Sequence, residues 1–352
     1  MRNHRTRGAA ALVGAATALI AAVVAPPTSG AFADPGVTPR STDVVGVGAD
    51  TTEALFDQLA SDHNATRHGR RLFSWRTHGS ATIRPKAGCR PITRPPGSSQ
   101  GIDALIARQV LPGGRPCIDF ARSIRPRLPG DPPNLRLFPF ATDGLTWAAN
   151  TDGNAPDSLT PPQLADIFTC RVRTWDRVGG TSADTIQPML PIVGPGITYF
   201  LNQLGVDKLG DCVRTGVPQD QGTDPLIAGN PNALVWYSIA KYLAQAEYGH
   251  DDQHGALSLR MIQGLAPAVR NPASGRVEIN AGQVAGVPAF PSTLMIKESV
   301  AVLAGPDGRL PRGPARLFAG PHSWICSSPR AQANIAEYGF LPLRGDSCGK
   351  PE

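Results

Sequence analysis

Three glycine-marked turns, each leading into a predicted helix, carry the residues best suited to ligand chemistry in this chain. Such a turn presents unpaired backbone N–H groups at the positive end of a helix dipole, and neighbouring hydroxyls add further donors. These groups can bind a small oxyanion without breaking any bond in it. At the first of these turns the alternative is an ordinary strand-to-helix connection capped by its own Asp50, because such connections are far commoner than ligand sites. The candidate ligand residues at the three turns are Asp50, Thr51, Thr52, Ser98, Ser99, Gly194, Gly196 and Thr198.

The first turn lies in residues 44–60, VVGVGADTTEALFDQLA. Its valines have the β-branched character of a buried strand, and the two glycines that follow permit close backbone approach and positive φ. Asp50 is the predicted N-cap of the next helix, and Glu53 stands three residues later, at the spacing of a capping box. The pattern therefore predicts strand, tight loop and helix.

The second turn, residues 97–101, reads GSSQG and precedes another predicted helix. The apolar positions expected on one face of that helix are Ile102, Leu105, Ile106 and Val110. The turn also matches GxSxG, the nucleophile elbow of serine hydrolases, with Ser99 as the nucleophile. An elbow needs an apolar strand directly before its first glycine, whereas Arg94-Pro95-Pro96 precedes this one. The hydrolase is therefore the weakest reading.

Arg122, Ser123 and Arg125 follow a predicted short strand at residues 117–121 and form a third group of polar candidates. Arginine binds oxyanions well because its planar guanidinium can donate two parallel hydrogen bonds. These side chains could face a ligand or water, and the sequence leaves both alternatives open.

The remaining predicted elements position these turns. Residues 135–150 are rich in apolar side chains and are predicted to cross between two lobes, with a turn at Asp143-Gly144. A helix is expected to begin at Thr160, with proline at its first position and Gln163 completing a capping box. Further strands are predicted at 71–75, 186–193 and 292–305, and further helices at 196–204, 234–246, 314–318 and 331–338.

The first 33 residues have the composition of a secretory signal peptide. Three arginines precede an alanine-rich apolar run, and Ala31-Phe32-Ala33 supplies a small-residue cleavage pattern. Removing these residues changes the formal net charge from +6 to +3, because it takes away three arginines and no acidic residue. That balance does not favour nucleic acid as a partner. We expect a secreted protein with no membrane span after signal removal.

Six cysteines in a secreted chain indicate disulfides. Proximity in the sequence suggests pairing of Cys89 with Cys117, Cys170 with Cys212 and Cys326 with Cys348, among fifteen formal pairings. A metal site is the weaker reading, because the chain has no CxxC motif and its seven histidines are scattered. We expect no cofactor and no metal.

The order of these motifs resembles the phosphate-binding proteins of bacterial phosphate ABC transporters, the PstS-like branch of the type II periplasmic binding proteins. The most specific piece is LADIFTCRVRTWDRVGG, with Cys170 at the family's usual glycine, and the segments GVGADTT, PPGSSQGI, CIDFARSIRP and VGPGIT resemble the four ligand loops. The resemblance implies an α/β, two-lobed venus-flytrap fold with two hinge crossings. It implies a linker at 34–42, a first lobe from 43–141 and 292–352, and a second lobe from 142–291.

The fourth loop departs from the family pattern. The family's arginine, serine and threonine that contact phosphate fall on Pro191, Pro195 and Ile197, whose side chains cannot donate. Pro195 also removes a backbone N–H from the helix start. The family's ligand aspartate aligns with Ile124. Arg122 or Arg125 would have to replace the lost positive charge.

The leading prediction is a secreted, noncatalytic solute-binding protein that binds phosphate or another small oxyanion between its lobes, with a partly degenerate phosphate site. The expected partners are that small anion and an ABC permease, and the expected state is a monomer. The alternative is a secreted interaction or structural protein on the same scaffold, without a solute site. The hydrolase using Ser99 is third.

Overall fold

The structure is a computed structural model that describes residues 34–352 except 67–69 and 108. The predicted signal peptide, residues 1–33, lies outside the described residues. No helix among the described residues is long and apolar enough to cross a membrane. Within the same residues, no three histidine, cysteine or acidic side chains are grouped so that they could hold a metal ion.

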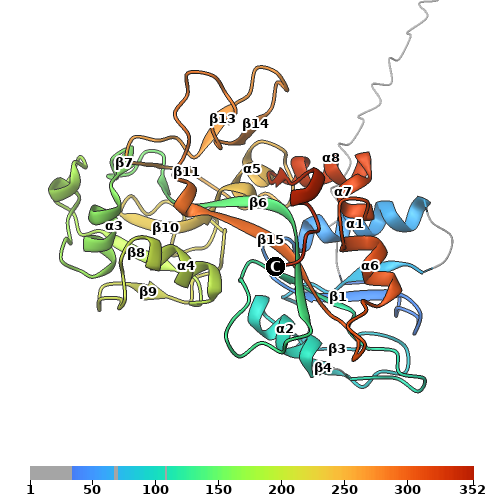
Figure 1. The fold of residues 1–352 in the computed structure, drawn as a ribbon. Coiled ribbons are helices and arrows are strands. Elements are labelled where there is room, and N and C mark those ends of the chain that lie inside the picture. The colour runs from blue at the N-terminus through green and yellow to red at the C-terminus, as the bar shows by residue number, and fades with distance from the viewer. Residues whose placement is uncertain (1–33, 67–69, 108) are drawn as a thin grey trace, which may run out of the picture. The chain divides into compact units, whose positions relative to one another are not determined.

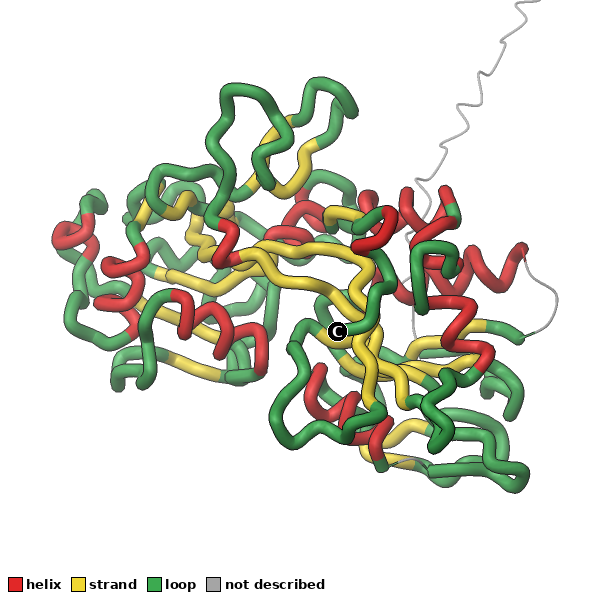
Figure 2. Tube along the Cα trace, viewed as in Figure 1, coloured by secondary structure: helices red, strands yellow, loops and turns green. Residues whose placement is uncertain are grey.

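A ten-stranded mixed sheet forms the centre of the fold, with the helices lying outside the strands (Figures 1 and 2). The main path of the sheet runs β2 (Leu72–Ser74), β1 (Val44–Gly48), β5 (Phe120–Ser123), β15 (Met295–Leu303), β6 (Leu135–Asn150), β10 (Ala233–Ser238), β8 (Gln187–Leu190) and β9 (Arg214–Thr215). Two further strands, β11 (Leu257–Leu259) and β16 (Leu341–Pro342), pair with β6. Three small two-stranded sheets are β12 (Met261–Ile262) with β7 (Ser158–Leu159), β13 (Ala268–Arg270) with β14 (Val277–Ile279), and β3 (Thr82–Ile83) with β4 (Ile92–Thr93).

The described helices are α1 (Glu53–Thr66), α2 (Ser98–Ile106), α3 (Pro161–Phe168), α4 (Pro195–Gln203), α5 (Ile239–Ala246), α6 (Arg312–Phe318), α7 (Trp324–Ser327) and α8 (Pro329–Glu337). Short 3₁₀ turns are η1 (Trp175–Val178), η2 (Ser292–Leu294) and η3 (Gly345–Ser347). The predicted capping box forms at α3, where the Thr160 hydroxyl and the Gln163 side chain each bind the other's backbone. Local sequence signals therefore place this helix correctly.

Two long strands, β6 and β15, join the two halves of the sheet (Figure 1). The first part of β6 pairs antiparallel with β15, from Leu135 opposite Leu303 to Gly144 opposite Met295. Its second part pairs with β10 and β11. Elements from both ends of the chain adjoin one half of the sheet and elements from the middle adjoin the other, which agrees with two crossings. The predicted lobe boundaries at 141 and 292 stay predictions.

The predicted turn at Asp143-Gly144 is wrong, because both residues lie inside the 16-residue strand β6. The Asp143 carboxylate accepts hydrogen bonds from the Ser238 hydroxyl at 2.6 Å and from the Ala240 N–H at 2.9 Å, so the acidic residue is satisfied within the sheet. A Cβ on Gly144 would lie 2.5 Å from the Ile239 side chain, so this glycine permits close packing of α5. Contacts with β10 and α5, not a turn, therefore account for Asp143 and Gly144 at these positions.

Three other predicted elements are also corrected. Residues 234–246 are not one helix, because 233–238 form the fully buried strand β10 before α5 begins. The hydrophobic pattern of a short apolar run that is buried on both faces does not distinguish a strand from a helix. Helix α2 ends at Ile106, and Val110 lies beyond it, exposed to solvent. The strand predicted at 117–121 forms at Phe120–Ser123.

The three predicted disulfides are confirmed. Cys89 bonds Cys117, Cys170 bonds Cys212 and Cys326 bonds Cys348, and no described cysteine is free. The closed loops span 28, 42 and 22 residues. Loops of this length are expected to contribute about 3 to 4 kcal/mol each by restricting the unfolded chain.

Candidate functional site

The three predicted ligand turns meet around one cleft of about 770 Å³. The starts of α2 and α4 line it, together with the loop after β1 and the loops at 124–128, 191–194 and 216–219. Turns that lie up to about 150 residues apart in the sequence therefore contribute to a single cavity. The predicted site residues found in its wall are Asp50, Ser98, Ser99, Gly194, Gly196 and Thr198.

The start of α2 is held against the end of β1 by two glycines. A Cβ on Gly101 would lie 2.5 Å from the Gly48 Cα, and Gly48 itself has a φ of 116°, which favours glycine. Gly97 caps α2 without a side-chain hydrogen bond, and the Ser98 hydroxyl accepts a hydrogen bond from the Ile124 N–H at 3.3 Å. Ser99 is half-buried in the wall of the cleft.

The start of α4 is covered by an apolar side chain. Gly194 is the N-cap without a side-chain bond, and proline occupies the first helical position. The Ile124 side chain lies so close to Gly196 that a Cβ there would clash with it, and the Trp236 ring lies 4.0 Å from the same point. Ile124 therefore places an apolar surface against the first turn of α4.

The loop after β1 differs from the predicted capping box. Helix α1 begins at Glu53, and its first backbone bond runs from Phe56 to the Thr52 carbonyl. The Glu53 carboxylate accepts hydrogen bonds from the Thr77 N–H and hydroxyl, and pairs with His78 at 3.1 Å. Asp50 accepts only from the neighbouring Thr51 N–H, at 3.0 Å. The Asp50 carboxyl is therefore not the helix cap and lies at the cleft wall.

The hydroxyls of Thr51 and Thr52 are buried without a hydrogen-bond partner. The two residues are only 3% and 1% exposed, and neither Oγ1 atom meets a donor or acceptor of the protein. A buried hydroxyl without a partner costs free energy, so such atoms favour a polar ligand close to the loop. Neither threonine belongs to the described wall of the cleft in this conformation.

Arg122 faces neither the cleft nor water, so both alternatives left open by the sequence are wrong for this residue. Its guanidinium is fully buried and donates to the carbonyls of Gly48, Ala49 and Trp75 at 2.9 to 3.1 Å, and to the Ser74 hydroxyl. The neighbouring Ser123 hydroxyl forms hydrogen bonds only with the Arg125 backbone. Arg122 and Ser123, both predicted ligand residues, therefore form hydrogen bonds with the loops of the site and do not line the cleft.

Arg125 lines the cleft but is already paired. It forms two parallel hydrogen bonds with the Asp131 carboxylate, at 2.8 and 2.9 Å, and this pairing lowers the pKa of Asp131. No other lysine or arginine belongs to the described wall of the cleft, whereas Asp50 does. The cleft therefore offers a dianion no free cation.

The outer wall of the cleft is apolar. Leu128, Ile192 and Val193 are 48%, 79% and 47% exposed, and they are among the few large hydrophobic residues of the described chain that face solvent. Further apolar residues of the wall are Ile124, Pro126, Pro191, Pro195, Ile197, Pro218 and Trp236. The prediction from sequence did not assign this wall to a ligand. The available signal was the apolar run PIV, which continues past the end of β8 into a loop.

The GxSxG reading of Ser99 gains no support from this geometry. The strand before it, β4, has two residues and is separated from Ser99 by prolines. No histidine belongs to the described wall around Ser99. A serine nucleophile needs a nearby base.

Acidic side chains lie at the cleft wall and in the strands that join the two halves of the sheet. Burial raises the pKa of Asp220 to about 8 and that of Asp143 to about 6. Burial also raises the pKa of Asp50, and raises that of Glu298 well above its usual range. Both Glu298 carboxyl oxygens lack a hydrogen-bond partner. Burial therefore favours the protonated form of these carboxyls more than solvent does.

Because the pKa values of these carboxyls are raised, we expect the free energy of unfolding to fall as pH rises. A carboxyl whose pKa is raised by folding contributes most below its unfolded pKa, and this contribution disappears as pH rises through the folded value. We expect the urea midpoint to fall between about pH 5 and pH 8.5. Asp220→Asn keeps an acceptor for the Ser238 N–H, and should be more stable than the parent at pH 8.5 by at least about 1.4 kcal/mol, the equivalent of one pKa unit. Asp152→Asn, at an exposed position, is the control. A urea midpoint of the parent that does not change with pH would contradict the raised pKa values of these carboxyls.

The fold is that of the two-lobed periplasmic binding proteins. The model of the PBP superfamily domain matches residues 33–279, and the chain belongs to that family. No curated protein matches the sequence.

Solved structures of phosphate-binding proteins share this fold. An ABC-type phosphate transport receptor from Vibrio cholerae is 17% identical, with a TM-score of 0.55 over 85% of this chain and 99% of that one. A putative phosphate ABC transporter substrate-binding protein with bound phosphate from Clostridium perfringens is 14% identical, with a TM-score of 0.56 over 86% and 100%. A phosphate-binding protein from Stenotrophomonas maltophilia is 12% identical, with a TM-score of 0.52 over 87% and 92%. The predicted resemblance is confirmed, and at these identities the likeness shows the fold.

Proposed function

We propose that this protein is a secreted, noncatalytic solute-binding protein whose cleft takes a small organic molecule with one polar head. The single observation that carries the proposal is the 770 Å³ cleft, which joins the starts of α2 and α4 to an apolar wall. Ligand pockets of this size are commonly apolar, with a few polar groups that fix orientation. The head is a hydroxyl or a singly charged oxyanion, because helix starts favour anions but Asp50 and the paired Arg125 do not favour a dianion.

Inorganic phosphate is a poor ligand in this proposal. The family's donor positions carry Pro191, Pro195 and Ile197, and Ile124 covers the start of α4. Secretion is supported by the N-terminal composition and the three disulfides. An ABC permease is included as the proposed partner because two structural relatives are named as ABC transport proteins.

A glycine substitution tests whether the cleft is the binding site. Gly194 has ordinary φ, and the nearest atom to an added Cβ is 3.8 Å away, so Gly194→Trp should fold and fill the cleft. Thermal-shift screening of carboxylates, phosphate esters and cell-wall fragments, followed by calorimetry, should give a ligand that the parent binds and this variant does not.

Gly36→Trp is the matched control, because Gly36 is exposed, has open space around it and lies outside the cleft. It should bind like the parent. If no compound binds, or if Gly194→Trp binds as well as the parent, the interaction or structural protein without a solute site becomes the better account.

A further inference from the structure

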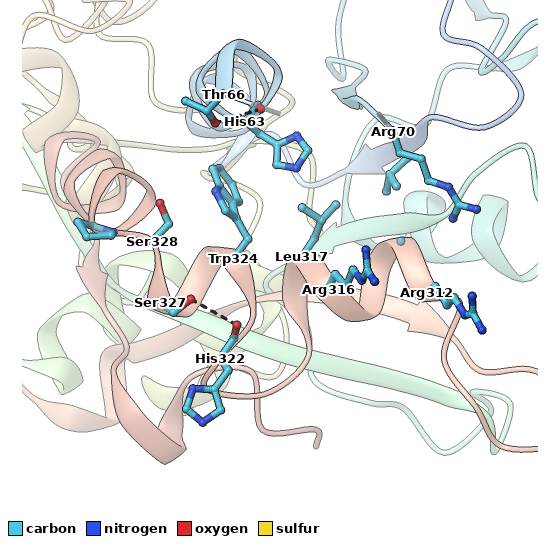
Figure 3. Close-up of a pocket in the computed structure, with 13 residues that line it drawn as sticks. His63, Thr66, Arg70, Arg312, Arg316, Leu317, His322, Trp324, Ser327 and Ser328 are labelled. Carbon is cyan, nitrogen blue, oxygen red and sulfur yellow. Dashed lines mark hydrogen bonds between the residues drawn. The ribbon is translucent and has the colours of Figure 1, made fainter. Parts of the chain in front are cut away.

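A second cavity, of about 1080 Å³, lies on the part of the fold that holds α1, α6 and α7. It shares no lining residue with the cleft. Figure 3 shows its wall, with Arg312 and Arg316 extending from α6 and Arg70 approaching from the segment after α1. Nothing in the proposed function uses this cavity.

The three arginines of this cavity are unpaired. No ion pair or side-chain hydrogen bond joins any of them to another described residue, and no acidic residue belongs to the described wall. Arg312 and Arg316 are one helical turn apart, so they lie on the same face of α6. The Arg70 guanidinium lies 3.6 Å from the point where a Cβ on Gly313 would stand, so it lies over the same helix. Three exposed positive charges therefore lie around this cavity with no acidic residue in its described wall. Burial raises the pKa of the Asp119 carboxyl, and the charge of Arg70 is among those that oppose this rise.

Two buried arginines close to the ligand loops are neutralised, whereas these three exposed arginines are not. Arg76 contacts Asp57 at 2.7 Å and Arg125 contacts Asp131 at 2.8 Å. Like charges close together repel, and although solvent screens this repulsion at exposed positions, a bound anion would reduce it further. Guanidinium groups bind phosphate oxygens with two parallel hydrogen bonds, and three of them match a ligand with more than one phosphate group.

An apolar surface lies beside the arginines. Leu317 and Val44 are buried in the wall, and Trp324 is half-buried there. The Trp324 ring meets the His63 ring edge-on, with centroids 5.1 Å apart and an angle of 84°, and this contact orients the indole. An indole oriented in this way can pack against a flat apolar group.

We propose that this cavity binds an organic diphosphate, with its phosphates on Arg70, Arg312 and Arg316 and its apolar substituent against Trp324 and Leu317. The volume exceeds what a single phosphate group needs, and the cationic and apolar parts of the wall are adjacent (Figure 3). The site is separate from the cleft, so the protein would bind two ligands of different chemistry.

Calorimetry with ADP as the probe tests this site. Pyrophosphate and adenosine, which represent the two parts of ADP, are measured in the same way. At low salt we expect one ADP per chain, weaker binding of pyrophosphate and no detectable adenosine. The Arg312→Gln, Arg316→Gln double variant should weaken ADP at least about tenfold, as expected for loss of charge-assisted hydrogen bonds. Trp324→Leu should weaken ADP and leave pyrophosphate binding unchanged.

Arg177→Gln is the control, because Arg177 is exposed and its side chain has no described partner. It should bind ADP like the parent. Gly194→Trp should also bind ADP normally, which separates this proposal from failure at the cleft. Absence of ADP binding, or binding that survives the double arginine variant, would overturn the proposal.

Discussion

Arg122→Met is expected to lower the free energy of unfolding by about 3 to 5 kcal/mol, more than any single change at the cleft wall. Methionine keeps much of the buried volume but donates no hydrogen bond. The carbonyls of Gly48, Ala49 and Trp75 would lose the guanidinium that now satisfies them. Each buried acceptor left without a partner costs about 1 to 3 kcal/mol. Urea denaturation at constant pH measures the difference.

Arg177→Met is the matched control, because it removes the same charge from an exposed position. It should change stability by less than about 0.5 kcal/mol. A comparably small effect of Arg122→Met would show that the loop carbonyls find other donors. It would also reopen the reading in which Arg122 serves a ligand.

Inorganic phosphate is expected to bind this protein several orders of magnitude more weakly than a complete oxyanion site would bind it. A tightly held dianion needs nearly every oxygen met by a donor in a dry cleft. The family resemblance implies donor side chains at positions where this chain has Pro191, Pro195 and Ile197, and each bond to a charged partner contributes about 1.5 to 3 kcal/mol. Neither Arg122 nor Arg125 compensates, because both guanidinium groups are already bonded.

Restoring donors should restore part of the affinity. The triple variant Pro191→Arg, Pro195→Ser, Ile197→Thr is expected to gain phosphate binding, and Ile124→Asp should add to the gain by uncovering the start of α4. Pro218→Ser, another change of proline at the cleft wall, is the control and should gain nothing. Calorimetry measures all four proteins. Submicromolar binding of phosphate by the parent would show that donors in the cleft have been overlooked.

Local signals in the sequence predicted much of the fold. The valines and glycines of 44–48 predicted β1, and the Thr160 capping box predicted α3, because both depend on residues that are neighbours in the chain. Cysteine proximity predicted all three disulfides. The motif order predicted the two-lobed fold of the family. Asp143 and Gly144 misled the prediction because a buried acidic residue and a close-packed glycine resemble a turn.

The sequence by itself determined that three glycine-marked turns precede helices, and that prolines and an isoleucine occupy 191, 195 and 197, where the family resemblance implies donors. Only the tertiary structure decided where the charges point. Arg122, Arg125 and Arg316 have the same chemistry in the sequence, yet one is bonded to loop carbonyls, one is paired with Asp131 and one is free beside a cavity. The physical reason is that a guanidinium can bond with whatever acceptor the fold brings within its reach, and residues such as Trp75 and Asp131 come within reach only when strands and loops distant in sequence are packed together.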